Sequence, residues 1–249
     1  MKTGIQISSL KPLLKTEEEV ISTFRRVAQM GGDAVQLQWI DPAVPVEAVA
    51  RAVAEARLIS VSVQDFYESV RENKSYYLDL NRLTGGEWLC VSRVPDRLKS
   101  RAGLDAYADE LRALMAEAEA LGQKVCFHPV AADYAPIGGV CPVDYLLEKL
   151  PALWLCADLY HLNKTGADMP AWLDQHAGRV CMAHFKDGKD GRLVPAGQGD
   201  TNWRGVVAAC VRAGVQYAFV EQETWDGDPF ICLQQALDWL NGEAARAGA

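Results

Sequence analysis

Two short runs decide the fold: CADLYH at residues 156–161 and VCMAHFKD at residues 180–187. Each run is apolar until it reaches polar side chains, which are Asp158 and His161 in the first and His184, Lys186 and Asp187 in the second. Continuous apolar runs of this length are typical of parallel strands that are buried on both faces. We therefore expect two neighbouring strands whose carboxyl ends bring a carboxylate, imidazoles and an amine together.

The alternation of an apolar run with a helical pattern recurs along the whole chain. The expected strands cover residues 5–8, 34–37, 59–63, 88–91, 124–127, 153–157, 180–185 and 217–221. The expected helices cover 16–30, 46–57, 104–121, 143–149, 172–176, 203–213 and 230–245, with loop plus helix at 66–83 and loops at 128–140 and 188–202. This pattern over 249 residues predicts one domain, residues 1–249, folded as a single α/β (β/α)₈ barrel.

Composition narrows the class of partner. The net charge is −8, from 25 basic and 33 acidic residues, which argues against a nucleic-acid partner. None of the seven cysteines forms a C-x-x-C pair, and four lie in expected strands, so we expect reduced core thiols and a cytoplasmic protein. There is no apolar run of about 20 residues and no signal-like start, so we expect no membrane partner.

Candidate metal ligands follow three consecutive expected strands. Asp158, His184 and Glu221 offer two carboxylates and one imidazole, and three of the four histidines lie near strand ends. This donor set suits one divalent ion, with Mn²⁺ expected first and Mg²⁺, Co²⁺ or Zn²⁺ as alternatives. Such an ion can chelate two neighbouring oxygens of a sugar.

Several motifs, in order along nearly the whole chain, resemble the xylose-isomerase-like family of barrels, the sugar phosphate isomerases and epimerases. GIQI at 4–7 resembles the opening strand, and MGGDAVQL at 30–37 resembles G-Y-D-G-V-E-L. ADLYH at 157–161 with GAD at 166–168 resembles D-x-x-H…G-x-D, and HFKD at 184–187 resembles H-x-K-D. GQGD at 197–200 resembles G-E-G-D, and VEQE at 220–223 resembles V-E-Q-D.

The resemblance implies four metal ligands, of which Asp158, His184 and Glu221 carry over directly. The fourth is an acid after strand five, where many members have Glu and this chain has His128. A subgroup reads Y-H-N-H-D-F-E-F there, and against that pattern Asp133 takes the place of the Glu. We therefore expect Asp133 as the fourth ligand. The alternatives are that His128 is the fourth ligand, or that neither residue binds the metal.

The expected activity is that of a metal-dependent sugar or keto-polyol isomerase or epimerase. A carboxylate with a raised pKa removes a proton beside a carbonyl, a metal-held cis-enediolate forms, and the proton returns to another carbon or face. Two alternatives are a related sugar lyase or dehydratase and a non-catalytic sugar-binding barrel with a degenerate metal site. The family also allows a homo-oligomer. The residues expected to move protons are Glu221 and Asp133, and those expected to contact the carbohydrate are His161, Lys186, His128 and Gln36.

Overall fold

Eight parallel strands close into a barrel in the computed structural model, which describes residues 1–32 and 34–248. Around the barrel the order is β1 (Lys2–Gln6), β10 (Tyr217–Val220), β7 (Val180–Phe185), β6 (Trp154–Asp158), β5 (Lys124–His128), β4 (Trp88–Ser92), β3 (Ile59–Phe66) and β2 (Ala34–Leu37). The expected single (β/α)₈ barrel is therefore confirmed. Asp33, part of the motif quoted for the second strand, lies outside the described residues.

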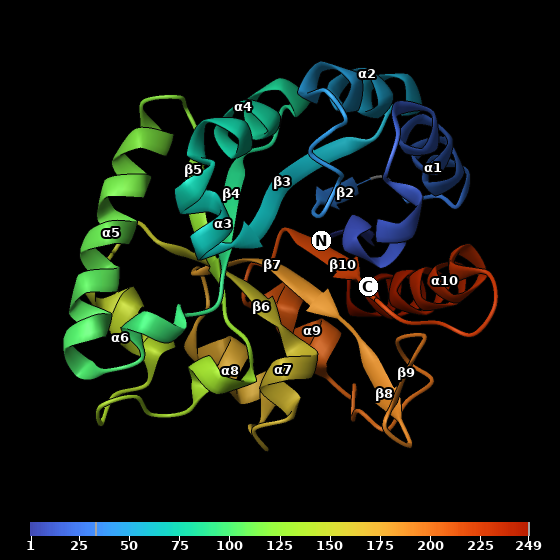
Figure 1. Cartoon of the computed structure of the whole chain (residues 1–249). Helices are drawn as coiled ribbons and strands as arrows, with labels where there is room; N and C mark the ends of the chain where they lie inside the picture. The colour runs from blue at the N-terminus through green and yellow to red at the C-terminus, as the bar shows by residue number, and fades with distance from the viewer. Residues whose placement is uncertain (33, 249) are drawn as a thin grey trace.

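Helices form a ring outside the strands, from α1 in blue to α10 in red (Figure 1). They are α1 (Glu17–Gln29), α2 (Val46–Ala56), α3 (Tyr67–Glu72), α4 (Lys74–Thr84), α5 (Arg101–Glu119), α6 (Pro142–Lys149), α7 (Leu159–Asn163), α8 (Met169–Gln175), α9 (Val206–Arg212) and α10 (Pro229–Ala247). Shorter 3₁₀ turns are η1 (Ile7–Leu13), η2 (Asp96–Leu98) and η3 (Ala131–Tyr134).

Helix α1 illustrates how the sequence sets these elements. Thr16 and Glu19 cap its start reciprocally, the Thr16 hydroxyl accepting from the Glu19 amide at 3.2 Å. Its buried face carries Val20, Phe24 and Val27, at the spacing of one side of a helix. The chain then turns at a glycine with positive φ (78°), Gly31.

Two loop expectations differ from the structure. Residues 67–84 form two helices, α3 and α4, rather than a loop and one helix. Within the loop expected at 188–202, β8 (Asp187–Lys189) pairs antiparallel with β9 (Arg192–Val194). The connection is Asp190-Gly191, both with positive φ (49° and 76°), and Asp-Gly is a strong two-residue hairpin signal.

Apolar side chains fill both sides of the strands, in two clusters. The larger lies between strands and helices, and the smaller gathers Cys90, Cys126, Cys156, Cys181 and Phe219, among others. These four cysteines are free and buried, as core thiols should be. Buried polar groups lie at the carboxyl ends of the strands and also inside β2 and β3, where Gln36, Ser62 and Gln64 are buried.

Over the described ranges 1–32 and 34–248, every helix is too short or too polar to span a bilayer.

Candidate metal centre

Side chains from three adjacent strands meet at the carboxyl end of the barrel. Asp158 and His184 are direct register partners on β6 and β7. Glu221 follows β10, and its backbone N–H donates to the Phe185 carbonyl at 3.1 Å, which continues the ladder. As a result, His184 Nδ1 lies 3.2 Å from Glu221 Oε2. The three residues expected as ligands are brought to one place.

His128, at the end of β5, completes this group. Its Nε2 lies 3.1 Å from His184 Nδ1 and 3.7 Å from Asp158 Oδ2. Donor atoms about 2.0–2.2 Å from a shared ion lie about 3–4 Å from one another. Ligand atoms of His128, Asp158 and His184 all fall within 4.8 Å of each other. The spacing therefore suits a single ion.

In each of these side chains one polar atom contacts a neighbouring residue, and the other polar atom faces the centre. The Asp158 Oδ1 accepts the His161 N–H at 2.9 Å and so caps α7. The Glu221 Oε1 accepts the Ser8 hydroxyl at 3.0 Å. His128 Nδ1 lies 3.1 Å from the Ser92 hydroxyl.

The atoms that face the centre include two buried carboxylate oxygens with unmet hydrogen-bonding capacity. Within residues 1–32 and 34–248, neither Asp158 Oδ2 nor Glu221 Oε2 accepts a hydrogen bond. Leaving a buried acceptor unsatisfied costs about 1–3 kcal/mol, and more for a charged group. Two such oxygens beside two imidazole nitrogens match the donors that a divalent cation takes, so the residues present fit a metal ion.

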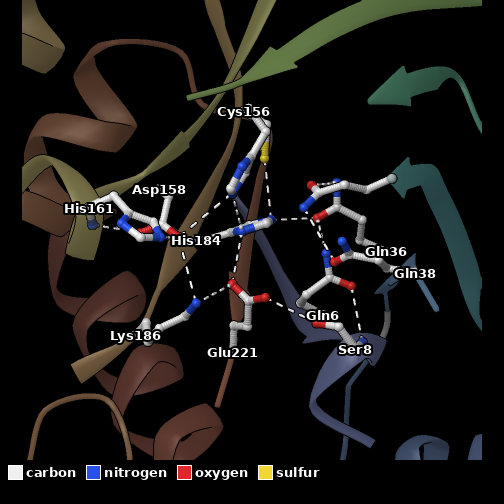
Figure 2. Close-up of polar contacts among 12 residues, drawn as sticks. Gln6, Ser8, Gln36, Gln38, Cys156, Asp158, His161, His184, Lys186 and Glu221 are labelled. Carbon is white, nitrogen blue, oxygen red and sulfur yellow. Dashed lines mark hydrogen bonds and ion pairs between the residues drawn. The ribbon is translucent and has the colours of Figure 1, made fainter. Parts of the chain in front are cut away.

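An ammonium group lies beside the same two oxygens. Lys186 Nζ is 3.2 Å from Glu221 Oε2, 3.8 Å from Asp158 Oδ2 and 2.6 Å from Glu223 Oε1. Figure 2 shows it on the same side of His184 as Asp158. Burial opposes the charge, but the carboxylates of Glu221, Asp158 and Glu223 raise the pKa of Lys186 above its ordinary value.

The two central carboxyls respond in the opposite direction. Burial by itself would raise the pKa of Glu221, but Lys186 and His184 hold it well below its usual value. Burial would also raise the pKa of Asp158, but Lys186 and the neighbouring histidines bring it below the ordinary range. Both groups are therefore ionised at neutral pH, unlike the raised pKa expected for the base.

The structure does not bring Asp133 to this centre. The side chain is fully buried, and its Oδ1 accepts the Val94 N–H at 3.2 Å while its Oδ2 accepts the Val130 N–H at 2.9 Å. Both oxygens thus tie the loop after β4 to the turn after β5. His128, not Asp133, presents a polar atom to the centre.

The residues expected to contact substrate separate into two groups. His161 lines a pocket of about 530 Å³ together with Lys186, Tyr160 and Trp225. Gln36 is fully buried and lies 2.5 Å from His184 Nε2, on the far side of the imidazole from the centre (Figure 2). It contacts His184 rather than this pocket.

Three further residues support the centre, and in the sequence they can be seen only as polar residues near strand ends. Ser8 and Ser92 orient Glu221 and His128, and Glu223 holds Lys186. The signal was their position at the ends of β1, β4 and β10. Which partner each would meet depends on barrel closure, which no local pattern encodes.

Asp187 organises the loop that follows β7. It accepts backbone N–H groups of Gly188, Gly197, Gly199 and Thr201 at 2.9–3.2 Å, and the Trp203 indole N–H at 2.9 Å. The glycine amides at 197 and 199 are therefore paired with the protein's own carboxylate.

A closed parallel barrel with ligand-type side chains at its strand ends defines an enzyme-like TIM barrel. The family described as xylose isomerase-like TIM barrel matches residues 24–243, and the chain belongs to that family. No curated protein is similar enough in sequence to count as a match.

Three of the solved structures with the same fold bear the names of sugar isomerases or epimerases. A sugar phosphate isomerase/epimerase from Parabacteroides distasonis ATCC 8503 is 18% identical with a TM-score of 0.80, over 96% of this chain and 97% of that one. An L-ribulose 3-epimerase is 17% identical (TM-score 0.80, 100% and 96%). The 3-keto-D-glucoside 4-epimerase from E. coli is 19% identical (TM-score 0.71, 97% and 99%). At these identities the likeness establishes the fold.

Proposed function

We propose that this protein is a divalent-metal-dependent isomerase or epimerase of a sugar or keto-polyol. The observation that carries the proposal is the cluster of His128, Asp158 and His184, whose ligand atoms lie within 4.8 Å of one another, with the buried Glu221 Oε2 3.2 Å from His184 Nδ1. The family and the sugar epimerases that share the fold support the same class of reaction.

In this proposal the ion is held by His128 Nε2, Asp158 Oδ2, His184 Nδ1 and Glu221 Oε2. The donor set of two imidazoles and two carboxylates suits Mn²⁺, Co²⁺ or Zn²⁺, and we take Mn²⁺ as the first ion to test. When bound, the ion would chelate two adjacent substrate oxygens and stabilise the negative charge that develops on deprotonation beside a carbonyl. Asp133 has no part in the set, because both its oxygens already accept backbone amides.

Glu221 is the carboxylate proposed to accept the proton. Its low pKa leaves it ionised at neutral pH, so it is in the protonation state that a base needs. The Ser8 hydroxyl fixes its Oε1, which leaves Oε2 as the atom that faces substrate and ion. Because Asp133 lies outside the proposed centre, Glu221 itself or a group that lines the pocket would return the proton to the substrate.

Lys186 and His161 are proposed to bind the substrate. Both line the pocket of about 530 Å³, whose size suits a monosaccharide or its derivative. The Lys186 ammonium lies 3.2 Å from Glu221 Oε2, close enough to pair with an oxygen that gains charge during the reaction. His161 presents ring nitrogens for a sugar hydroxyl, its Nε2 lying 3.8 Å from Asp158 Oδ2.

The test is solvent deuterium exchange into a panel of ketoses and keto-inositols, with and without added Mn²⁺, followed by NMR. The proposal expects Mn²⁺-dependent deuterium incorporation at a carbon beside the carbonyl, together with an isomer or an epimer. A dehydrated product would instead indicate the alternative class, a sugar dehydratase. Glu221→Gln should abolish the exchange, whereas Asp133→Asn should retain it. A protein that binds Mn²⁺ but exchanges no proton in any of these compounds would be a binding barrel, contrary to the proposal.

A further inference from the structure

Four buried glutamine side chains form a hydrogen-bonded chain behind His184 (Figure 2). Gln6 Nε2 donates to Gln36 Oε1 at 3.0 Å, Gln36 Nε2 donates to Gln64 Oε1 at 3.0 Å, and Gln64 Nε2 donates to Gln38 Oε1 at 3.3 Å. All four are at most 5% exposed. Buried amides of this kind are retained only when their donors and acceptors are satisfied.

The direction of the chain is fixed at its first member. The Ser8 backbone N–H, which can only donate, points at Gln6 Oε1 from 3.4 Å. Gln6 must therefore present its amide nitrogen to Gln36, and Gln36 must present its oxygen in return. The Cys90 thiol, 3.3 Å from Gln64 Oε1, agrees with this direction further along.

The oxygen of Gln36 also faces His184 Nε2, at 2.5 Å. Two acceptors cannot approach so closely, so Nε2 must carry the hydrogen. The Cys156 sulfur lies 3.3 Å from the same nitrogen and would favour the other tautomer by donating its thiol hydrogen. In that tautomer the unprotonated Nε2 would face the Gln36 oxygen. The Gln36 contact is the shorter of the two, so it determines that the hydrogen lies on Nε2.

We propose that Gln36 is a positioning residue that keeps a hydrogen on Nε2 of His184, so that Nδ1 is the ring nitrogen left to bind a metal ion. Nδ1 faces Glu221 Oε2 and His128 Nε2, the direction in which the metal ligands of the proposed function point. In the metal-free protein the Glu221 oxygen, 3.2 Å away, can hold a proton on Nδ1 that a bound ion would displace. A second hydrogen bond that orients a ligating imidazole typically changes metal affinity 10–100-fold.

The amide at position 36 also continues the chain to Gln64, which a carboxylate cannot do. Gln36 Oε1 accepts from both Gln6 and His184, which uses its two lone pairs. Its Nε2 then donates to Gln64, and a glutamate has no donor for that purpose. The motif G-Y-D-G-V-E-L, which residues 31–37 resemble, has glutamate at this position. A glutamate here would force the side-chain amide of Gln64 to turn.

The first test reads the tautomer in the metal-free protein and needs no activity. The chain has four histidines, so the imidazole ¹⁵N shifts of ring-labelled protein can be resolved and assigned. Wild type should show His184 protonated at Nε2. Gln36→Met should lower the protonated fraction at Nε2. Gln38→Met, the same change at the far end of the chain, should leave His184 as in wild type.

The second test measures Mn²⁺ binding by calorimetry in the same proteins. Gln36→Met should weaken binding about 10–100-fold, and Gln38→Met should weaken it less than threefold. Gln36→Glu, which keeps an acceptor for His184, should restore the Nε2–H tautomer and serves as a second variant where Gln36→Met fails to fold.

Two results would overturn the proposal: a wild-type His184 without a hydrogen on Nε2, or Gln36→Met and Gln38→Met behaving alike in both tests. The metal part rests on the proposed function, and the protonation of Nε2 does not. A wild-type protein without Mn²⁺ binding but with Nε2 protonated would therefore defeat the metal centre and leave the role of Gln36 intact.

Discussion

Buried carboxylates at the barrel mouth fall into two groups that differ in how their oxygens are held. Asp158 and Glu221 each have one oxygen fixed by a neighbour and the other directed at the centre. Asp133 and Asp187 have both oxygens engaged by N–H groups of the chain. All four are buried carboxylates, so the occupancy of each oxygen is what separates the proposed ligands from the loop anchors.

Glu221→Gln should give the largest effect. Loss of the carboxylate removes both a metal ligand and the proposed base, so we expect proton exchange to fall about 10²–10⁴-fold. Mn²⁺ binding should weaken at least tenfold. Deuterium exchange and calorimetry measure the two losses, and the thermal midpoint shows whether the barrel remains folded.

Asp133→Asn is the matched control from the other group. The Mn²⁺ affinity and exchange rate of this variant should stay within about threefold of wild type, since both Asp133 oxygens accept hydrogen bonds from the Val94 and Val130 amides. An exchange rate as low as that of Glu221→Gln, in a folded Asp133→Asn protein, would move Asp133 into the reaction and break the comparison.

Asp187→Ala should give the largest loss of stability. The change leaves four backbone N–H groups and the Trp203 indole without their shared acceptor. We expect the free energy of unfolding to fall by about 3–5 kcal/mol, as measured by urea denaturation. Asp200→Ala, an exposed acid in the same loop, should change it by less than about 0.5 kcal/mol. Equal losses in the two variants would contradict the role of Asp187.

Asp133→Asn should destabilise the fold more moderately, by about 1–2 kcal/mol. The substituted amide keeps one oxygen acceptor but turns an NH₂ group toward a backbone N–H, which leaves both of these buried donors without an acceptor. Urea denaturation of the variant tests this value. No loss of stability would mean that the two amide contacts do not anchor these loops.

The smallest effect concerns a half-buried carboxylate paired at the surface. Arg97 binds both oxygens of Glu110, at 2.9 and 2.6 Å, and this contact lowers the pKa of Glu110. The stabilisation is present above the ordinary pKa of about 4.3 and is lost as pH falls below it. Arg97→Met should therefore cost less than about 1 kcal/mol at pH 7, and the difference should shrink at pH 3.

Arg25→Met provides the reference for that measurement. Arg25 forms an ion pair with Glu55 in which both side chains are more than half exposed, so we expect no measurable change at either pH. An Arg97→Met penalty that grows as the solution is acidified would have the wrong sign for a pair that depends on ionised Glu110.

The barrel and most of its centre could be predicted from the sequence because their signals are local. Asp158, His184 and Glu221 each end an apolar run, and parallel strands of a barrel end on one face. His128 and Asp133 could not be separated in this way, since both follow β5. The choice depended on Val94, which comes from the preceding loop and reaches Asp133 only in the folded chain.

Long-range contacts also explain the other differences. Gln36 was expected to contact substrate because it lies in β2 among other strand-end polar residues, and closure of the barrel places it against His184, 148 residues later. The β8–β9 hairpin had its Asp-Gly signal at 190–191, but the glycine-rich surroundings masked it. Spacing predicts the elements well, and it predicts poorly which atom of a side chain is already engaged.

Anomalous diffraction at the manganese edge, from crystals grown with Mn²⁺, tests the central claim most directly. The account predicts one peak per chain, about 2.0–2.3 Å from His128 Nε2, Asp158 Oδ2, His184 Nδ1 and Glu221 Oε2. A peak on Asp133, or no peak among these four side chains at saturating Mn²⁺, would contradict it.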